Sequence, residues 1–205
     1  MGEQLVHRPA PLPWREVSRP AWQDLHIAWA SRFPNTPIEK EIQTAIEQLA
    51  NQLDRLGAHV KQVWPTVDLV EQSRWSERFF EIIVGSFKPQ PSSLRDYFEA
   101  LHRREAFVYA WEQFLSEWDV FLCPAYHRTA RRHDESVGAI DASVSAESLS
   151  GTTGQPALVI PIAKGRNGLP IGVQVIARRW DDERLLAIAE LIVEVTGGFQ
   201  RPPGY

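Results

Sequence analysis

The stretch Gly151–Ala177, "GTTGQPALVIPIAKGRNGLPIGVQVIA", constrains the fold more than any other part of the chain. Two apolar runs, Ala157–Ile162 and Pro170–Ala177, flank a connection rich in Gly and Asn. Short apolar runs separated by such turn residues predict two strands joined as an antiparallel hairpin. Almost no reactive side chain lies in this stretch, so its pattern specifies backbone geometry more than chemistry.

A second unit near the amino terminus alternates strand, helix and strand. The runs Asp24–Ala30 and Ala58–Pro65 have the composition of short strands. Thr36 and Glu39 predict a capping box at the start of the intervening helix, and Gly57 predicts its end. Apolar residues recur in that helix at helical spacing: Ile38, Ile42, Ala45, Ile46, Leu49, Leu53 and Leu56. This order predicts a right-handed parallel crossover.

Two further helices are predicted in the middle of the chain. The first covers residues 68–84, and the second begins at Ser93, where Asp96 completes a capping box. The apolar side of the second helix carries Leu94, Tyr97, Phe98, Leu101, Val108, Trp111, Leu115 and Trp118. We expect this side to pack against the rest of the protein.

A short buried strand and a long polar segment follow. Asp119–Pro124, "DVFLCP", is apolar enough for a buried strand. Ala125–Ser150 has few large apolar residues, which predicts a long loop with at most one short helix. Long loops in compact domains are often functional. All these elements together predict an α/β fold, with a mixed β-sheet flanked by helices.

The two ends of the chain differ in character. Residues 1–20 contain four prolines and predict an extended lead-in. Near the carboxyl end, Asp181 or Asp182 is expected to cap a last helix that stops at Gly197. Residues 21–205 are therefore expected to form one α/β domain.

The charge and cysteine content narrow the class of function. The formal net charge is −4, with Arg and Lys scattered along the chain, which argues against a nucleic-acid partner. The single cysteine, Cys123, excludes an internal disulfide and suits a reducing compartment. No apolar run approaches the ~20 residues that span a bilayer. We therefore expect a cytoplasmic protein that binds neither membrane nor nucleic acid.

Reactive side chains follow the predicted buried strand. Cys123 with His127 or His133 has the residue types of a thiol nucleophile and its base. A cysteine that ends an apolar strand is more often a small buried hydrophobe. His127, His133 and Asp134 are metal-ligand types, but a metal site needs three or four ligands at close spacing. The glycines match no nucleotide-binding loop and no serine elbow is present, so we expect no metal and no cofactor.

Three segments, in order and spacing, resemble the C-terminal portion of the amidase signature family. They are "FLCPAYHRTA", "GTTGQPALVIPI" and "NGLPIGVQVIARRWDDERLLAIAE". The resemblance covers about Arg8–Tyr205, and the paired "GQPA" and "GLPIGVQ" are its most specific part. It implies a fold that resembles the C-terminal half of the amidase signature enzymes. It also implies hydrolysis of carboxamide C–N bonds.

The catalytic residues of that family have no counterpart here. The family uses a Ser–Ser–Lys triad from a glycine- and serine-rich signature and an upstream lysine, both before the region matched. The only Ser-Ser pair of this chain, Ser92-Ser93, lies at a predicted helix start. No catalytic residue is therefore assigned. Position at predicted strand ends suggests a set of substrate-pocket candidates: Cys123, Pro124, Tyr126, His127, Thr152, Thr153 and Gln155.

The sequence leaves three functions open. The first is the C-terminal half of an amidase-family hydrolase, inactive alone and acting on a small-molecule amide once completed. The second is a non-catalytic binding or interaction protein derived from an amidase. The third, least favoured, is a free-standing hydrolase that uses Cys123. Because a divided sheet exposes an edge and an apolar face, we expect self-association or a separate N-terminal amidase half as the partner.

Overall fold

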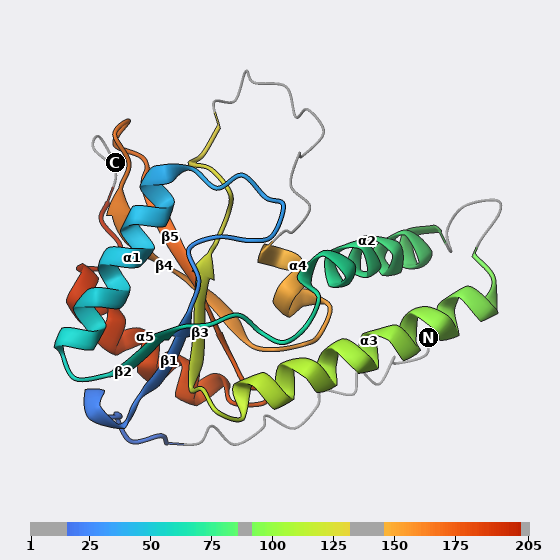
Figure 1. Ribbon diagram of the computed structural model, residues 1–205, viewed down its shortest axis with the longest axis horizontal. Coiled ribbons are helices and arrows are strands. Elements are labelled where there is room, and N and C mark those ends of the chain that lie inside the picture. Colours follow the sequence, from blue (N-terminus) through green and yellow to red (C-terminus); the bar gives the residue numbers. More distant parts are fainter. Residues whose placement is uncertain (1–15, 86–91, 132–145, 202–205) are drawn as a thin grey trace, which may run out of the picture.

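The computed structural model describes residues 16–85, 92–131 and 146–201 of the chain. One five-stranded sheet has the order β2-β1-β3-β5-β4 (Figure 1). Its strands are β1 (His26–Trp29), β2 (His59–Gln62), β3 (Val120–Pro124), β4 (Ala157–Lys164) and β5 (Pro170–Ala177). The helices are α1 (Lys40–Arg55), α2 (Leu69–Gly85), α3 (Leu94–Leu115), α4 (Ala146–Gly151) and α5 (Asp182–Thr196). β1 is parallel to β2 and β3, whereas β5 is antiparallel to β3 and β4, which confirms the mixed α/β sheet.

The amino-terminal strand, helix and strand form as predicted. β1 and β2 pair in parallel, and α1 connects them. The buried side of α1 consists of Ile42, Ala45, Ile46, Leu49, Ala50 and Leu53, which follow the helical period of the sequence. After the helix, Gly57 has a φ of +102°, a conformation that favours glycine.

The predicted capping box at the start of α1 is wrong. The helix begins at Lys40, and the side chain of the preceding Glu39 makes no capping bond. The Thr36 hydroxyl donates instead to the Pro34 carbonyl at 3.2 Å. The Glu39 carboxylate accepts from the backbone amide of Thr129 at 2.9 Å. A contact between residues 90 positions apart therefore replaces the expected local pair.

The sheet has two differently covered faces. Successive side chains of each strand point to opposite faces of the sheet. One face, called the α1 face here, carries Ile27, Val120, Leu122, Val173 and Val175. It is covered by α1 and α5 (Figure 1). The opposite α4 face carries Ala28, Phe121, Cys123, Gln174 and Ile176, and it is turned toward α2, α3 and α4 (Figure 1). On that face Trp111 of α3 packs against Phe121, with ring centroids 5.9 Å apart.

α2 and α3 pack against each other and extend away from the sheet (Figure 1). The predicted capping box of α3 is present, since Ser93 Oγ accepts from the Asp96 amide at 3.2 Å and the Asp96 carboxylate accepts from the Ser93 amide at 3.0 Å. The predicted apolar side of α3 is buried only toward its carboxyl end, where Trp111 lies. Leu94 is 70% exposed and Phe98 59% exposed. The amino-terminal half of that side therefore faces solvent.

β4 and β5 form the predicted antiparallel hairpin. A β-bulge shifts the register between Pro161 and Ala163. Gly172 lies opposite Pro161, and a Cβ at Gly172 would come within 2.7 Å of a Val159 methyl carbon, so glycine leaves room for the Val159 side chain. β4 is an edge strand among the described residues, and Val159, on its α4 face, is 58% exposed.

The remaining predictions concern the loop and the two ends. Within the predicted loop the structure contains one short helix, α4. α5 begins after Asp181 as expected, although no side-chain capping bond forms, and Gly197 ends it with a φ of +80°. Residues 16–20 contain neither helix nor strand. Residues 1–15 and the positions of His133 and Asp134 lie outside the described residues.

Candidate functional site

The carboxyl ends of the parallel strands β1 and β3 lie side by side at one end of the sheet, and α/β proteins usually bind ligands at this end. Pro124 ends β3, and Tyr126 and His127 follow it with ring centroids 4.3 Å apart. The His127 carbonyl accepts from the Glu39 amide at 2.9 Å, which ties this segment to the start of α1. Burial lowers the pKa of His127, with a contribution from Arg128, so its imidazole is neutral at pH 7.

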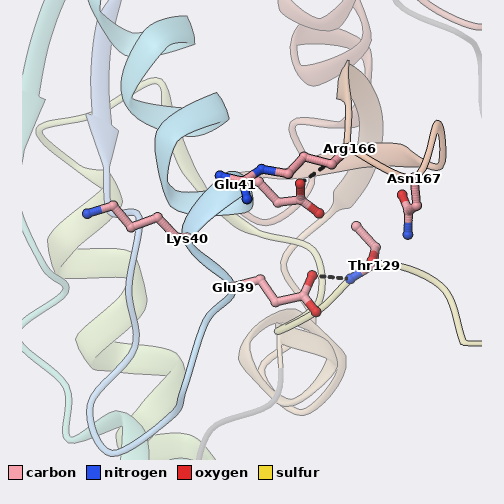
Figure 2. A pocket seen from close by; sticks show the side chains of 6 residues that line it. All are labelled: Glu39, Lys40, Glu41, Thr129, Arg166 and Asn167. Carbon is pink, nitrogen blue, oxygen red and sulfur yellow. Dashed lines mark hydrogen bonds between the residues drawn. The ribbon is translucent and has the colours of Figure 1, made fainter.

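A cavity of about 370 Å³ opens beside this segment (Figure 2). It is lined by Glu39, Lys40, Glu41, Thr129, Arg166 and Asn167. Both carboxylates bind backbone amides: Glu39 accepts from Thr129, and Glu41 accepts from Arg166 at 3.0 Å. Figure 2 shows the Lys40 side chain directed away from these pairs. The carboxylates therefore join α1 to two loops, and the cavity offers polar recognition without a nucleophile and base pair.

Cys123 is fully buried in β3 and is paired in register with Gln174. Burial raises the pKa of its thiol well above the ordinary range, so the thiol stays protonated and inaccessible. This environment disfavours a Cys123 nucleophile. Among residues 16–85, 92–131 and 146–201, no three metal-type side chains gather in one place.

The candidates Thr152, Thr153 and Gln155 belong to the segment Gly151–Gln155, which joins α4 to β4. Thr153 is fully buried, and its hydroxyl donates to the Leu149 carbonyl at 2.6 Å and contacts the Gln155 side chain. The Thr152 hydroxyl contacts Ser76 of α2. Thr153 therefore fixes the conformation of this segment, whereas Thr152 joins it to α2.

A second cavity, of about 430 Å³, adjoins this segment. Its lining residues are Ser150, Gly151, Gly154, Gln155, Pro156, Ala157, Trp180 and Asp182. Gly154 has a φ of +77°, and its amide donates to the Ser150 carbonyl at 2.7 Å. The tight turn at Gly154 thus exposes backbone of the segment at the rim of a concave surface.

The two candidate segments lie at opposite ends of the sheet along the strand direction. Pro124 pairs with Val173, which pairs with Ile160, whereas β4 begins three residues earlier at Ala157. At about 3.4 Å per residue, the Gly151–Gln155 segment lies at least ~10 Å before the level of Pro124 along the strands.

Sequence reasoning missed the residues that hold α4 in place. Gln72 and Ser73 of α2 are buried, and Gln72 hydrogen-bonds to α4 and α3. The signal was present, since Leu69, Gln72, Ser73 and Ser76 occupy the inward positions of α2 at helical spacing. Polar residues at such positions require buried partners, so they indicate a hydrogen-bond network rather than simple packing.

No helix in the described part of the chain combines the length and apolarity that a bilayer crossing demands. The sequence model of the amidase family matches residues 73–186, more than half of the chain. The chain is 26% identical to an indoleacetamide hydrolase of Bradyrhizobium japonicum, over 92% of this chain and 46% of that protein. It is 24% identical to a glutamyl-tRNA(Gln) amidotransferase component of Brevibacillus brevis, over 73% of this chain and 32% of that protein. The chain thus spans less than half the length of these relatives.

Two solved structures share the fold. A fatty acid amide hydrolase superposes with a TM-score of 0.76 at 17% identity, over 92% of this chain and 42% of that one. The corresponding glutamyl-tRNA(Gln) amidotransferase component of Thermotoga maritima superposes with a TM-score of 0.74 at 22% identity, over 89% and 46%. In both cases nearly the whole chain corresponds to under half of a larger protein.

Proposed function

Because this chain belongs to the amidase family, we propose that it is the C-terminal half of an amide C–N hydrolase. It supplies sheet strands and substrate-pocket segments, while another segment supplies the groups that break the bond. The observation that carries the proposal is the coverage: 92% of the chain corresponds to 42% of a fatty acid amide hydrolase structure.

The reaction is acyl transfer to an activated hydroxyl, followed by hydrolysis. The hydroxyl oxygen bonds to the carboxamide carbon, the C–N bond breaks and the departing amine takes a proton. Water then cleaves the ester and releases the acid and the free hydroxyl. By resemblance, a Ser–Ser–Lys triad performs these steps, and no position of this chain matches it. The chain alone is therefore expected to be inactive.

The substrate contacts of this half are assigned to Pro124–His127 and Gly151–Gln155. Neutral His127 and Tyr126 offer hydrogen-bonding groups at the carboxyl edge of β3. Cys123, one of the sequence-based candidates, is fully buried and is not assigned a substrate contact. Because the two segments lie ~10 Å apart along the strands, a small-molecule amide that contacts both must be at least that long.

The partner in this proposal is an N-terminal amidase half that adds to the sheet at β4. β4 is eight residues long and has no charged side chain before Lys164. Its first four residues, Ala157–Ile160, precede Pro161 and the β-bulge, and an uncharged edge segment of this kind favours pairing with another chain. The other edge strand, β2, is four residues long and exposes Lys61, which disfavours such pairing.

The test expresses the chain alone and together with an N-terminal half derived from a related amidase. Hydrolysis of aryl amides is expected only from the combination. Val159→Lys, on the β4 edge, is expected to abolish complementation, whereas Lys61→Glu on the β2 edge is the matched control and is expected to preserve it. Complementation that survives Val159→Lys would contradict the assigned edge.

Other outcomes decide among the alternatives. Activity of the chain alone would refute the proposal, and its loss in Cys123→Ala would identify a thiol hydrolase. A stable complex without activity would favour the non-catalytic interaction protein. Neither complex nor activity, with a dimer of the chain alone, would favour self-association through the same edge.

A further inference from the structure

A single buried side chain joins three helices on the α4 face. Gln72 of α2 is fully buried. Its amide nitrogen donates to the carbonyls of Ser148 and Leu149 in α4, both at 3.0 Å. Its amide oxygen accepts from the indole N–H of Trp111 in α3 at 2.8 Å. Rotating the amide by 180° would oppose oxygen to two carbonyls, so one orientation alone satisfies all three partners.

α4 depends on these bonds because six residues are too few to persist as a helix alone. The carbonyls of its last turn receive no hydrogen bond from backbone amides within the helix. Gln72 supplies donors to two of them, and the hydroxyls of Ser76 and Thr153 supply further donors to the Ser148 and Leu149 carbonyls at 3.4 Å and 2.6 Å. Without Gln72, two buried carbonyls lose their amide donor, which carries a desolvation penalty.

The same two long helices hold the residues that follow α4. Ser76, one turn after Gln72, contacts the Thr152 hydroxyl. Arg104 of α3 donates from Nε to the Thr152 carbonyl at 2.6 Å. These partners lie 76 and 48 residues apart in sequence. The Gly151–Gln155 segment therefore takes its position from α2 and α3 as well as from the sheet.

We propose that Gln72 is a positioning residue that fixes α4 and the Gly151–Gln155 segment and thereby sets the affinity for the amide substrate. The effect on affinity rests on the proposed function, which assigns substrate contacts to this segment. The effect on position rests on the hydrogen bonds alone. Gln72 acts through α4 and is not a catalytic residue.

Hydrogen exchange of the free chain tests the positioning directly. In Gln72→Leu, amides 150–155 are expected to exchange about tenfold faster or more, because local opening becomes easier. Amides of α1 and α5 are expected to keep their rates. Ile82→Val, a conservative change at a buried apolar position of α2, is the matched control and is expected to leave amides 150–155 unchanged.

Two further variants separate the bonds that Gln72 makes. A carboxyl group at this position retains an acceptor for Trp111 but offers at most one O–H in place of the two N–H donors. Gln72→Glu is therefore expected to accelerate exchange at 150–155 while the Trp111 indole N–H stays protected. Trp111→Phe removes the indole donor and leaves both α4 bonds. It is expected to change exchange at 150–155 by less than about threefold.

The completed enzyme supplies the second readout. Gln72→Glu is expected to raise KM about tenfold with kcat within about threefold, the pattern of lost binding that is uniform between ground and transition state. Unchanged exchange at 150–155 in both Gln72 variants would overturn the inference, as would equal acceleration in α1 and α5. Since exchange requires no substrate, a failure of complementation would count against the proposed function and not against the positioning role.

Discussion

The two faces of the sheet are closed in different ways. On the α1 face, two helices of 16 and 15 residues bury aliphatic side chains against the strands. On the α4 face, a helix of six residues is held by side-chain hydrogen bonds from α2. Six of the eight buried polar side chains of the described residues gather near α4: Gln72, Ser73, Ser148, Thr153, Gln155 and Gln174.

This difference separates contributions to the folding free energy from contributions to the precise location of a segment. Apolar burial is not directional, and it contributes free energy that is roughly proportional to the area removed from water. Hydrogen bonds contribute less net free energy but fix direction and distance. Both faces bury apolar side chains, Trp111 and Phe121 among them on the α4 face, so both supply folding free energy. We infer that the hydrogen bonds of the α4 face in addition fix the location of the segments assigned to the substrate.

The largest expected effect concerns access to the core beneath the α4 face. Cys123 is fully buried and burial raises the pKa of its thiol. We expect thiol reagents at pH 8 to modify the native chain at least about 10³-fold more slowly than the urea-unfolded chain, because reaction requires opening. Reaction rates followed by absorbance measure this. Similar rates in the two states would mean that the α4 face opens freely.

The next effect tests the α1 face. Leu53 of α1 is fully buried, and Leu53→Ala is expected to lower the free energy of unfolding by about 2–5 kcal/mol. Leu56, 43% exposed, gives the control, because Leu56→Ala removes far less buried area. Urea titrations followed by tryptophan fluorescence provide the values. Equal losses in the two variants would refute the unequal burial.

A buried hydroxyl on the α4 face is expected to matter less. Thr153→Val removes the donor to the Leu149 carbonyl at nearly constant volume, at a cost of about 1–3 kcal/mol. The exposed Thr66 supplies the comparison, with a change near zero for Thr66→Val. A loss for Thr153→Val that matches Leu53→Ala would remove the proposed division between the faces.

The capping box of α3 lies beyond both faces. Ser93→Ala removes the bond to the Asp96 amide, and we expect a loss of about 1 kcal/mol in the free energy of unfolding. Circular dichroism during urea unfolding measures it. Ser93→Asp restores an acceptor and is expected to recover most of the loss. Failure of that variant to exceed Ser93→Ala would argue against capping as the cause.

The smallest effect is electrostatic. Hydrogen bonding to Arg19, at 2.8 Å, lowers the pKa of the Glu194 carboxyl below its ordinary value. The pair therefore stabilises the fold above the ordinary pKa, and this contribution is lost as pH falls through the lowered pKa. Both side chains are largely exposed, so solvent and salt screen the pair. NMR titration should show the Glu194 pKa rising in Arg19→Ala. An unchanged pKa would exclude the pair.

The order of elements was predictable because its signals are local. Glycines and prolines bound the β4–β5 hairpin, and apolar periodicity marks α1. The Thr36 prediction failed because Glu39 binds the Thr129 amide, a partner that no local pattern names. The apolar side chains at the amino-terminal half of α3, such as Leu94 and Phe98, are exposed because this half extends away from the sheet. The helical spacing of the sequence does not show where that contact ends.

The candidate site was predictable only in part. The sequence places its candidate residues after β3 and before β4, but strand order decides at which end of the sheet each segment lies. β5 lies between β3 and β4 and is antiparallel to both, so β3 and β4 run in the same direction. The segment after β3 and the segment before β4 therefore lie at opposite ends of the sheet. Gln72 was missed because its partners lie 39 to 77 residues away in sequence.

The central place of β3 has a consequence for the order of folding. β1 and β2 form from one stretch of chain, and β4 and β5 from another, so each pair closes a shorter loop than β3 closes with β1. The five residues of β3 pair with both units, and their contact with β1 spans about 90 residues of intervening chain. Such distant contacts form slowly. We expect the two pairs to form early and independently, and the docking of β3 to limit the rate at which they become one sheet.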